Sequence, residues 1–395
     1  MFSHLQIRNR RERTLVGLAD AVTMPVGWWS RRPPDQIRRV LLMRLERIGD
    51  LLMTLDAIGL ARQLLPDARI DLAVGSWNAE LARLLPGINR LEVMDVPWLA
   101  RTGTGWSWGA LIAGARRWKR QGYDLVLNFE PDIRSNFLSW LSGGCRRAGY
   151  FTGGGGAFLT DSWAYAPTEH VSTNASRLVY RALQVADNDA KAGAVARLHL
   201  AVPDEAHARA DALVPADTRL VGVHVSGGRP SKQWHADRFG DAVRRIAERR
   251  GATVVLTGNA SDRPLVDAVA ARLAGTPFVD LCGRADLTTL AAVLARLELL
   301  VTGDTGPMHL AAAVGTPVVA LFGPSDPRRY GPTGPTHQVL RVDLPCSPCG
   351  LVRMPPADCR DRVPECLDRI TVEMVLEAAD RIGPPNSSAG RQITV

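Results

Sequence analysis

The sequence predicts an α/β protein built from two doubly wound domains, each around a parallel sheet. Short apolar runs of strand length alternate with segments of helical periodicity, first over residues 39–128 and again over residues 219–323. Such alternation is typical of parallel sheets covered by helices on both faces. A chain of 395 residues also exceeds what one core usually serves. We therefore expect two domains that face each other across a cleft, with the ligand at the strand ends.

Residues 1–38 form a basic, amphipathic N-terminal extension. Eight arginines against three acids give residues 1–40 a charge of +5, out of +8 for the whole chain. The apolar segment Leu15–Trp29 between the arginines has two interpretations. It is a helix lying on an anionic membrane surface, or it packs on the domain or stays disordered. A secretory signal fits less well, because Asp20 interrupts the apolar run and Pro25 follows it.

An N-terminal Rossmann-like domain is expected over residues 39–200. Its apolar runs predict strands at 39–45, 70–74, 91–93 and 123–128, and its periodic segments predict helices at 51–65, 79–85, 111–121 and 171–185. Gly153–Gly156 lies in a loop-like stretch that continues to Thr168, either a mobile loop near a ligand or a flexible connection. Composition alone places the domain boundary between about residues 190 and 217.

A second Rossmann-like domain is expected over residues 218–370. Strands are predicted at 219–225, 253–257, 299–302 and 317–323, and helices at 239–249, 265–273, 287–297 and 310–314. A C-terminal helix over 371–384 and a flexible tail over 385–395 complete the chain. No segment offers eighteen uncharged apolar residues, so we expect no membrane span.

Four of the six cysteines gather in the tail as Cys346, Cys349, Cys359 and Cys366. A C-x-x-C pair followed by two further cysteines is compatible with a structural zinc site, but the second pair does not have the spacing of a standard ribbon. Free thiols, or a disulfide under oxidising conditions, are the alternatives. Cys145 and Cys282 are expected to be small buried residues.

The turn Asp304–His309 follows one predicted strand and opens a small-residue helix. The carboxyl ends of parallel strands and the N-termini of the following helices are where such sheets bind ligands, and phosphate is favoured there. Thr305 is expected to cap the helix, Gly306 to let a phosphate approach the backbone, and His309 to face the same mouth. The alternative is a capped helix with a core histidine.

Two further turns carry reactive side chains. Asp50, at the first strand-to-helix turn, is either a general base for a hydroxyl or a helix cap. The segment Ser226–Trp234 follows the first strand of the second domain and contains Arg229 and Lys232, which suit an anion or are solvated cations of a surface loop. The pattern Asp187–Asp189 lies in a polar connection and is interpreted as solvated loop.

Together these turns resemble glycosyltransferase family 9, the heptosyltransferases that build the lipopolysaccharide inner core. The resemblance covers about residues 39–384 and is strongest in the second half. It rests on the following stretches: Met43–Leu45, Ile48–Asp50, Lys232–Trp234, Val255–Gly258, Asp304–His309 and Gly315–Pro324, together with the cysteine-rich tail that ends in Ile370-Thr371.

The resemblance implies a GT-B fold and an inverting, metal-independent transferase that needs no cofactor. Asp50 matches the proposed base, and Lys232 matches the lysine that meets the donor phosphates. The donor side is expected to comprise Ser226, Gly227, Lys232, Thr257, Gly258, Asp262, Asp304, Thr305, Gly306 and His309. The acceptor side is expected to comprise Arg47, Glu130, Asp132 and Arg134.

The implied partners are a nucleotide-diphospho-sugar donor, ADP-heptose in particular, and a lipid-anchored saccharide such as the lipopolysaccharide core. An anionic membrane surface contacted through residues 1–38 is a further candidate partner, and no nucleic-acid motif accompanies the positive charge. The implied location is the cytoplasm, with a peripheral position on the inner face of the cytoplasmic membrane as the variant. An epimerase or hydrolase acting on sugar nucleotides, and a non-catalytic binding protein, are the alternatives.

This chain departs from the family pattern at two places. After the strand at 123–128 it has Asn128–Asp132, where family members carry Asp-x-Gln-Gly, and this lies on the acceptor side. After Gly258 the usual acid is displaced, with Asn259 and Asp262 as candidates, and this lies near the nucleoside. The Trp-bearing extension before residue 40 is an addition to the family pattern.

Overall fold

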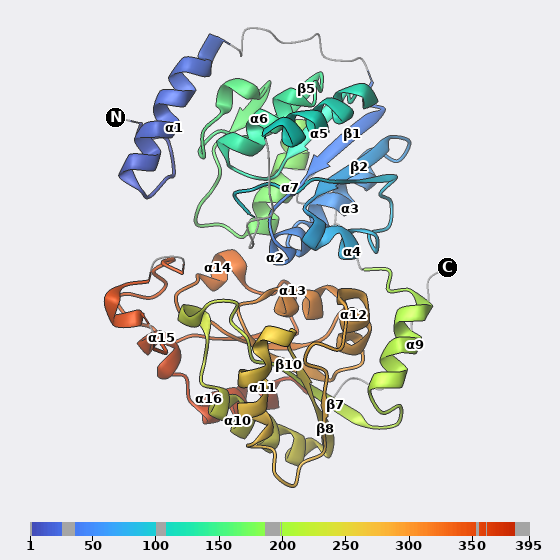
Figure 1. Ribbon diagram of the computed structural model, residues 1–395, viewed down its shortest axis with the longest axis vertical. Coiled ribbons are helices and arrows are strands. Elements are labelled where there is room, and N and C mark those ends of the chain that lie inside the picture. Colours follow the sequence, from blue (N-terminus) through green and yellow to red (C-terminus); the bar gives the residue numbers. More distant parts are fainter. Residues whose placement is uncertain are drawn as a thin grey trace. The chain divides into compact units, whose positions relative to one another are not determined.

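The computed structural model describes residues 2–25, 36–99, 108–185, 198, 200–352, 355–360 and 362–383. The chain divides into two compact units, residues 1–201 and 202–395 (Figure 1). Each unit is described by itself below. The Asp187–Asp189 pattern and the tail 385–395 lie outside the described residues.

Six parallel strands form the sheet of the first unit, in the order β3-β2-β1-β4-β5-β6. The strands are β1 (Arg39–Met43), β2 (Arg69–Val74), β3 (Arg90–Val93), β4 (Leu125–Asn128), β5 (Arg146–Tyr150) and β6 (Asp161–Trp163). The helices are α1 (Arg10–Thr23), α2 (Ile48–Leu52), α3 (Leu55–Leu64), α4 (Ala79–Ala82), α5 (Trp108–Gln121), α6 (Ile133–Leu141) and α7 (Val171–Ala182), with short 3-10 turns η2 (Ser76–Asn78) and η3 (Gly156–Phe158).

The second unit has the same architecture, with the strand order β12-β11-β10-β7-β8-β9, again all parallel. Its strands are β7 (Arg219–His224), β8 (Ala252–Thr257), β9 (Phe278–Asp280), β10 (Leu299–Gly303), β11 (Val318–Leu321) and β12 (Gln338–Leu340). Its helices are α9 (Asp204–Leu213), α10 (Ala236–Arg250), α11 (Arg263–Ala270), α12 (Leu287–Ala295), α13 (Gly306–Ala313), α14 (Pro327–Tyr330), α15 (Glu365–Asp368) and α16 (Val372–Arg381), with 3-10 turns η4 (Pro230–Lys232), η5 (Ala260–Asp262) and η6 (Ala357–Cys359).

Both sheets reverse direction at a central pair of strands. The chain builds outward from β1 to β3 and then returns to place β4 on the other side of β1. In the second unit the same reversal places β10 beside β7. In doubly wound sheets the loops that leave such strand pairs diverge to opposite faces, and ligands bind at this point.

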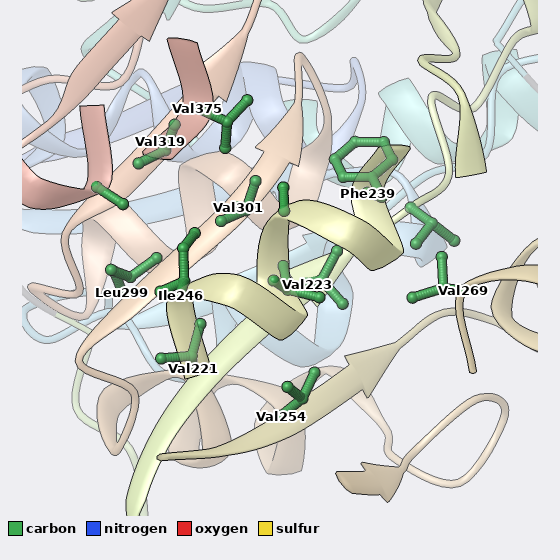
Figure 2. Packing of buried hydrophobic residues seen from close by; sticks show 14 of the residues in the cluster. Val221, Val223, Phe239, Ile246, Val254, Val269, Leu299, Val301, Val319 and Val375 are labelled. Atoms are coloured by element: carbon green, nitrogen blue, oxygen red, sulfur yellow. The ribbon is translucent and has the colours of Figure 1, made fainter. Parts of the chain in front are cut away.

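The core of the second unit shows why these sequences form buried strands. Val221, Val223, Leu299 and Val301 on the two central strands are fully buried, and they pack with Phe239 of α10 (Figure 2). Nearly continuous apolar runs are what a parallel strand covered on both faces requires. The C-terminal helix α16 belongs to the same core, because Val375, Leu376, Ala378 and Ala379 pack into it.

Two expectations about local structure are wrong. The stretch expected to be loop from Gly153 to Thr168 contains η3 and the edge strand β6, which is only three residues long and carries Trp163 beside Tyr150 of β5. The helix expected over 51–65 is two helices, because α2 begins within the predicted turn and ends at Leu52. Short elements of this kind give too few residues for a periodic pattern.

Candidate functional site

In the first unit, charged side chains gather where β1 and β4 end, at the reversal point of the sheet. Arg44 directly follows β1, Asp50 lies in α2, and Glu130 comes two residues after β4. The two strands are neighbours, so residues separated by about eighty positions in the chain meet at one edge. This is the position at which doubly wound sheets hold ligands.

The Arg44 guanidinium organises this cluster. Its side chain is 4% exposed, and Nη1 lies 2.9 Å from Oε2 of Glu46 while Nη2 lies 3.6 Å from Oδ1 of Asp50. It also donates to the main-chain oxygens of Asp50, at 3.2 Å, and Phe129, at 3.1 Å. Burial acts to lower the pKa of Arg44, but the carboxylates around it outweigh burial and raise that pKa. A permanent, buried positive charge therefore stands beside Asp50.

Asp50 combines the two roles that the sequence left open. Its Oδ2 accepts the main-chain N–H of Arg47 at 3.2 Å, so it does cap the start of α2. Its side chain nevertheless remains 27% exposed. The cap and the pairing with Arg44 hold the carboxylate in one orientation while part of it is open to solvent. An oriented carboxylate that reaches solvent is what a general base for a hydroxyl requires.

Glu130 is buried and fixes the backbone that leads to Asp50. Its Oε1 accepts main-chain N–H groups from Leu45, in a short hydrogen bond, and from Glu46 at 3.1 Å. Burial, followed by the negative charge of Glu46, raises the pKa of Glu130 to about 8. Near neutral pH this side chain is therefore mainly a neutral carboxyl that holds the β1–α2 turn.

The other acceptor-side candidates lie on α6 and in the β1–α2 turn. Asp132 caps α6, accepting the N–H of Arg134 at 2.8 Å, and its other oxygen lies 2.5 Å from the Arg134 guanidinium. That guanidinium stacks over the ring of Trp98, 4.8 Å from the ring centre. Arg47 donates to the main-chain oxygen of Leu99 at 3.3 Å. These side chains form a polar and aromatic rim suited to sugar hydroxyls or acidic groups.

Gly153 allows a surface loop to approach this cluster closely. A Cβ atom at Gly153 would lie 1.7 Å from the main-chain oxygen of Pro131, which no side chain could tolerate. The loop thereby packs on the segment between Glu130 and Asp132. A stretch of four glycines in the sequence thus serves close packing beside the candidate site.

In the second unit, an ion pair joins the loops that leave β7 and β10. Lys232 Nζ lies 2.7 Å from Oδ2 of Asp304, and the two side chains are 18% and 13% exposed. These strands are neighbours and mark the reversal point of the second sheet. The structure thus brings together two of the turns that the sequence analysis singled out.

The chain between β7 and Lys232 folds back tightly. A Cβ atom at Gly227 would lie 2.6 Å from the main-chain carbon and oxygen of Lys232. The Gln233 side chain closes the loop, accepting the N–H of Gly227 at 3.1 Å and donating to the oxygen of Val225 at 2.9 Å. Ser226 is buried and accepts the N–H of Gly228 at 3.3 Å. Gly227 therefore allows the main chain at Lys232 to pack against the start of this loop.

Helix α13 starts at Gly306, directly after this ion pair, but Thr305 does not cap it as expected. Thr305 occupies the capping position, yet its hydroxyl contacts Thr302 Oγ1, at 3.3 Å, and the oxygen of Gly303, at 3.4 Å. The amides of the first turn therefore receive no bond from this side chain. They are donors at the positive end of the helix dipole, next to a lysine, as an anion site requires. His309 is 7% exposed on the same helix.

Thr257, Gly258 and Asp262 line the end of the neighbouring strand β8. Asp262 accepts the N–H of Asn259 at 2.9 Å and is buried, so it caps η5. The Thr257 hydroxyl contacts Nδ1 of His224 at 3.1 Å. Burial lowers the pKa of His224 to about 4, against the opposing effect of Asp262. This end of the sheet therefore holds a neutral imidazole beside a carboxylate.

The tail cysteines are free thiols. Among the described residues, no three His, Cys, Asp or Glu side chains are placed to hold a metal ion, so the structure gives the zinc expectation no support. Burial first, and then the charges of Cys349, Cys359 and Cys346, raise the pKa of the Cys366 thiol to about 11.

Arg44 and His224 are charged or titratable residues at strand ends that were not among the predicted site residues. Arg44 could have been suspected, because a charged residue that directly follows an apolar strand is buried or paired. His224 ends an apolar strand in the same way. Apart from the pairing of Arg44 with Glu46, their partners lie 6 to 85 positions away in the chain, so no local pattern could have shown these contacts.

Comparison with known proteins agrees with this geometry. The model of glycosyltransferase family 9 (heptosyltransferase) matches residues 112–354. Lipopolysaccharide heptosyltransferase 1 of Pseudomonas aeruginosa is 27% identical over 321 residues, which cover 79% of this chain and 86% of that protein.

Two solved structures share the fold. A family 9 glycosyltransferase from Veillonella parvula has a TM-score of 0.72 and 24% identity, over 89% of this chain and 98% of that one. The Escherichia coli heptosyltransferase WaaC with ADP-2-deoxy-2-fluoro heptose has a TM-score of 0.65 and 20% identity, over 87% and 99%.

The two parallel-sheet units are thus those of a GT-B protein, and the chain is a glycosyltransferase. It belongs to glycosyltransferase family 9. This membership favours a transferase over the epimerase, hydrolase and non-catalytic alternatives. None of the helices in the described part of the chain is long and apolar enough to cross a membrane.

Proposed function

We propose that this protein transfers a heptose from ADP-heptose to a lipid-anchored saccharide of the lipopolysaccharide core. The observation that carries the proposal is the Lys232–Asp304 pair at the reversal point of the second sheet, next to the uncapped start of α13. A lysine held in place and the main-chain N–H groups at the start of a helix are suited to bind a diphosphate. The relatives named above support heptose as the sugar and ADP as the carrier.

The proposed reaction divides between the two units. Asp50 in the first unit takes the proton from an acceptor hydroxyl, and the hydroxyl oxygen attacks the anomeric carbon of the donor. The bond from that carbon to the diphosphate oxygen breaks on the opposite side, so the configuration inverts. Lys232 and the α13 amides stabilise the negative charge that develops on the departing ADP.

This arrangement needs no metal ion, because protein groups supply the positive charge. Lys232 is already held in place by Asp304, and the amides of α13 require no reorganisation when charge develops. Activity should therefore persist in excess chelator. Loss of activity on chelation, restored by a divalent cation, would contradict this part of the proposal.

Donor identity is tested by a thermal-shift panel of ADP-, UDP-, GDP- and dTDP-sugars, since a ligand that binds only the folded state raises the melting temperature. We expect the largest shift with ADP-heptose. Transfer is then tested with ADP-heptose and a heptose-deficient lipopolysaccharide core. Consumption of the donor at the same rate without acceptor would instead indicate a hydrolase or an epimerase.

A further inference from the structure

Helix α1 is attached to the first unit along one side only. Asp20 Oδ1 accepts the N–H of Gly155 at 2.5 Å, and Gly17 is buried against the ring of Phe2. Just before the helix, Gln6 donates its main-chain N–H to the oxygen of Thr152 at 2.7 Å and its side-chain amide to the oxygen of Tyr165 at 2.8 Å. The N-terminal segment is therefore a docked part of this unit, and the orientation of α1 is defined.

The opposite side of α1 is apolar and open to solvent. Leu15, Leu18 and Val22 follow one another at helical spacing, and their exposed fractions are 69%, 53% and 79%. We call these three side chains the α1 ridge. Of the seven large hydrophobic residues exposed in the described part of the chain, three form the ridge and a fourth, Met24, directly follows the helix. Among the described residues, exposed large hydrophobic side chains are thus concentrated on and directly after helix α1.

Exposed cations lie on α1 and on a helix connected to it. Arg8, Arg10 and Arg11 are exposed at the start of the helix. Helix α1 contacts η3, η3 contacts α6, and α6 contacts α5. Helix α5 contains no acidic residue, and its exposed cations are Arg116, Arg117, Lys119 and Arg120. An apolar strip with exposed cations on the same helix suits a partner that is apolar inside and anionic at its surface.

An anionic bilayer meets both requirements at once. Leucine and valine side chains enter the boundary between headgroups and acyl chains, while nearby arginines meet lipid phosphates. A second copy of the chain would cover the apolar strip, but it would bring a second set of the same cations to the same interface. Charge complementarity therefore favours lipid over self-association.

We propose that the α1 ridge docks this protein on the surface of an anionic phospholipid bilayer. The helix lies along the membrane plane and does not cross it. Docking does not depend on which sugar is transferred, so it stands apart from the proposed function.

The proposal also implies that the acceptor-side candidates Asp132 and Arg134 lie near the membrane surface. Glu12 of α1 is close enough to Arg134 of α6 to interact with it electrostatically, and Arg134 is paired with Asp132. A helix held at the bilayer would therefore hold this rim near the membrane as well. This consequence rests on the proposed function, because it assumes that the acceptor is anchored in lipid.

Flotation of the full chain with vesicles tests the docking. Vesicles of phosphatidylcholine alone are compared with vesicles that also contain phosphatidylglycerol, at low and at high salt. We expect flotation with the anionic vesicles and its loss at high salt, because exposed charges are screened. The double variant Leu18→Asp, Val22→Asp should bind the anionic vesicles at least about tenfold more weakly, because it replaces two apolar side chains of the α1 ridge by carboxylates.

The matched control is Phe278→Asp, which places a carboxylate on an apolar residue that is 44% exposed on β9 of the second unit. It should float like the unchanged protein, and all three proteins should melt at the same temperature. Equal flotation of the double variant, or equal binding to neutral and anionic vesicles, would overturn the proposal. So would a concentration-dependent dimer that the double variant loses while no protein floats, because a second copy would then cover the ridge.

Discussion

The buried carboxyl of Glu130 should make the stability of this protein fall as the pH rises. Its pKa is raised from 4.5 to about 8 in the folded protein. Between these values the folded state retains a proton that the unfolded state has lost. Linkage then requires the free energy of unfolding to fall with rising pH, by up to about 1.4 kcal/mol per pH unit from this group.

The variant Glu130→Gln isolates this contribution. The introduced amide keeps an oxygen that can accept the N–H groups of Leu45 and Glu46, and it cannot ionise. At pH 7, about 2.5 pH units above the pKa of the unfolded chain, Glu130 is ionised only in the unfolded state. This lowers the free energy of unfolding of the wild-type protein by about 3 kcal/mol. We expect the variant to be more stable than the wild type at pH 7 and equally stable near pH 4.

The assay is urea denaturation of both proteins at a series of pH values between 4 and 9, followed through the transition of the first unit. The difference between the two free energies of unfolding should grow from pH 5 to pH 8 and level off above it. Glu130→Ala is the control: it removes the acceptor for two buried N–H groups and should destabilise the protein at every pH.

Two results would refute this reasoning. Parallel stability curves for the wild type and Glu130→Gln between pH 5 and pH 8 would show that Glu130 ionises normally in the folded protein. A variant that is less stable at pH 7 would show that the ionised carboxylate pairs favourably with Arg44. In that case the cluster beside Asp50 would carry one more negative charge than is inferred here.

Three further predictions concern the two candidate sites. Asp50→Asn should lower kcat by about 100-fold or more with donor affinity unchanged, while Asp67→Asn, in an exposed turn, should have no effect; normal turnover of the first variant would leave Asp50 only its capping role. Lys232→Ala should weaken donor binding about tenfold or more and also slow turnover, in contrast to Lys119→Ala on the surface of α5, and unchanged calorimetric affinity would remove Lys232 from the donor site. His224, whose pKa is lowered to about 4 by burial, stays neutral in the folded protein while the unfolded chain gains a proton below pH 6.5. The contribution of His224 to the stability of the second unit should therefore fall by up to about 3 kcal/mol from pH 6.5 to pH 4, opposite in sign to the contribution of Glu130 to the first unit. His224→Asn should reduce the change in the urea midpoint of the second unit over that pH range; an unchanged pH dependence would contradict the prediction.

Local patterns in the sequence predicted much of the fold. The apolar runs at 219–225 and 299–302 gave β7 and β10 almost to the residue, because a strand buried on both faces must be continuously apolar. The short edge strands β6, β9 and β12 were not predicted, since three residues carry no usable pattern and an edge strand is only partly buried. Packing against a neighbour decides whether such a segment is a strand.

The sequence predicted several residues of the candidate sites, but it did not predict how they pair. Asp304 and Lys232 stood out because charged residues after buried strands mark the ligand-binding edge of a parallel sheet. That the two form an ion pair with each other follows from the pairing of β7 with β10, which no local pattern records. In the same way, Arg44 and Glu130 acquire their importance only when β4 pairs with β1.

The sequence alone determined the fold class, the family and the turns that carry chemistry, because hydrophobic periodicity and strand-to-helix turns depend on neighbours along the chain. The tertiary structure alone decided the charge state of Glu130, the orientation of Asp50 and the side of α1 that faces solvent. Burial and electrostatic interaction depend on which distant residues are brought together, and that is settled only when the chain packs.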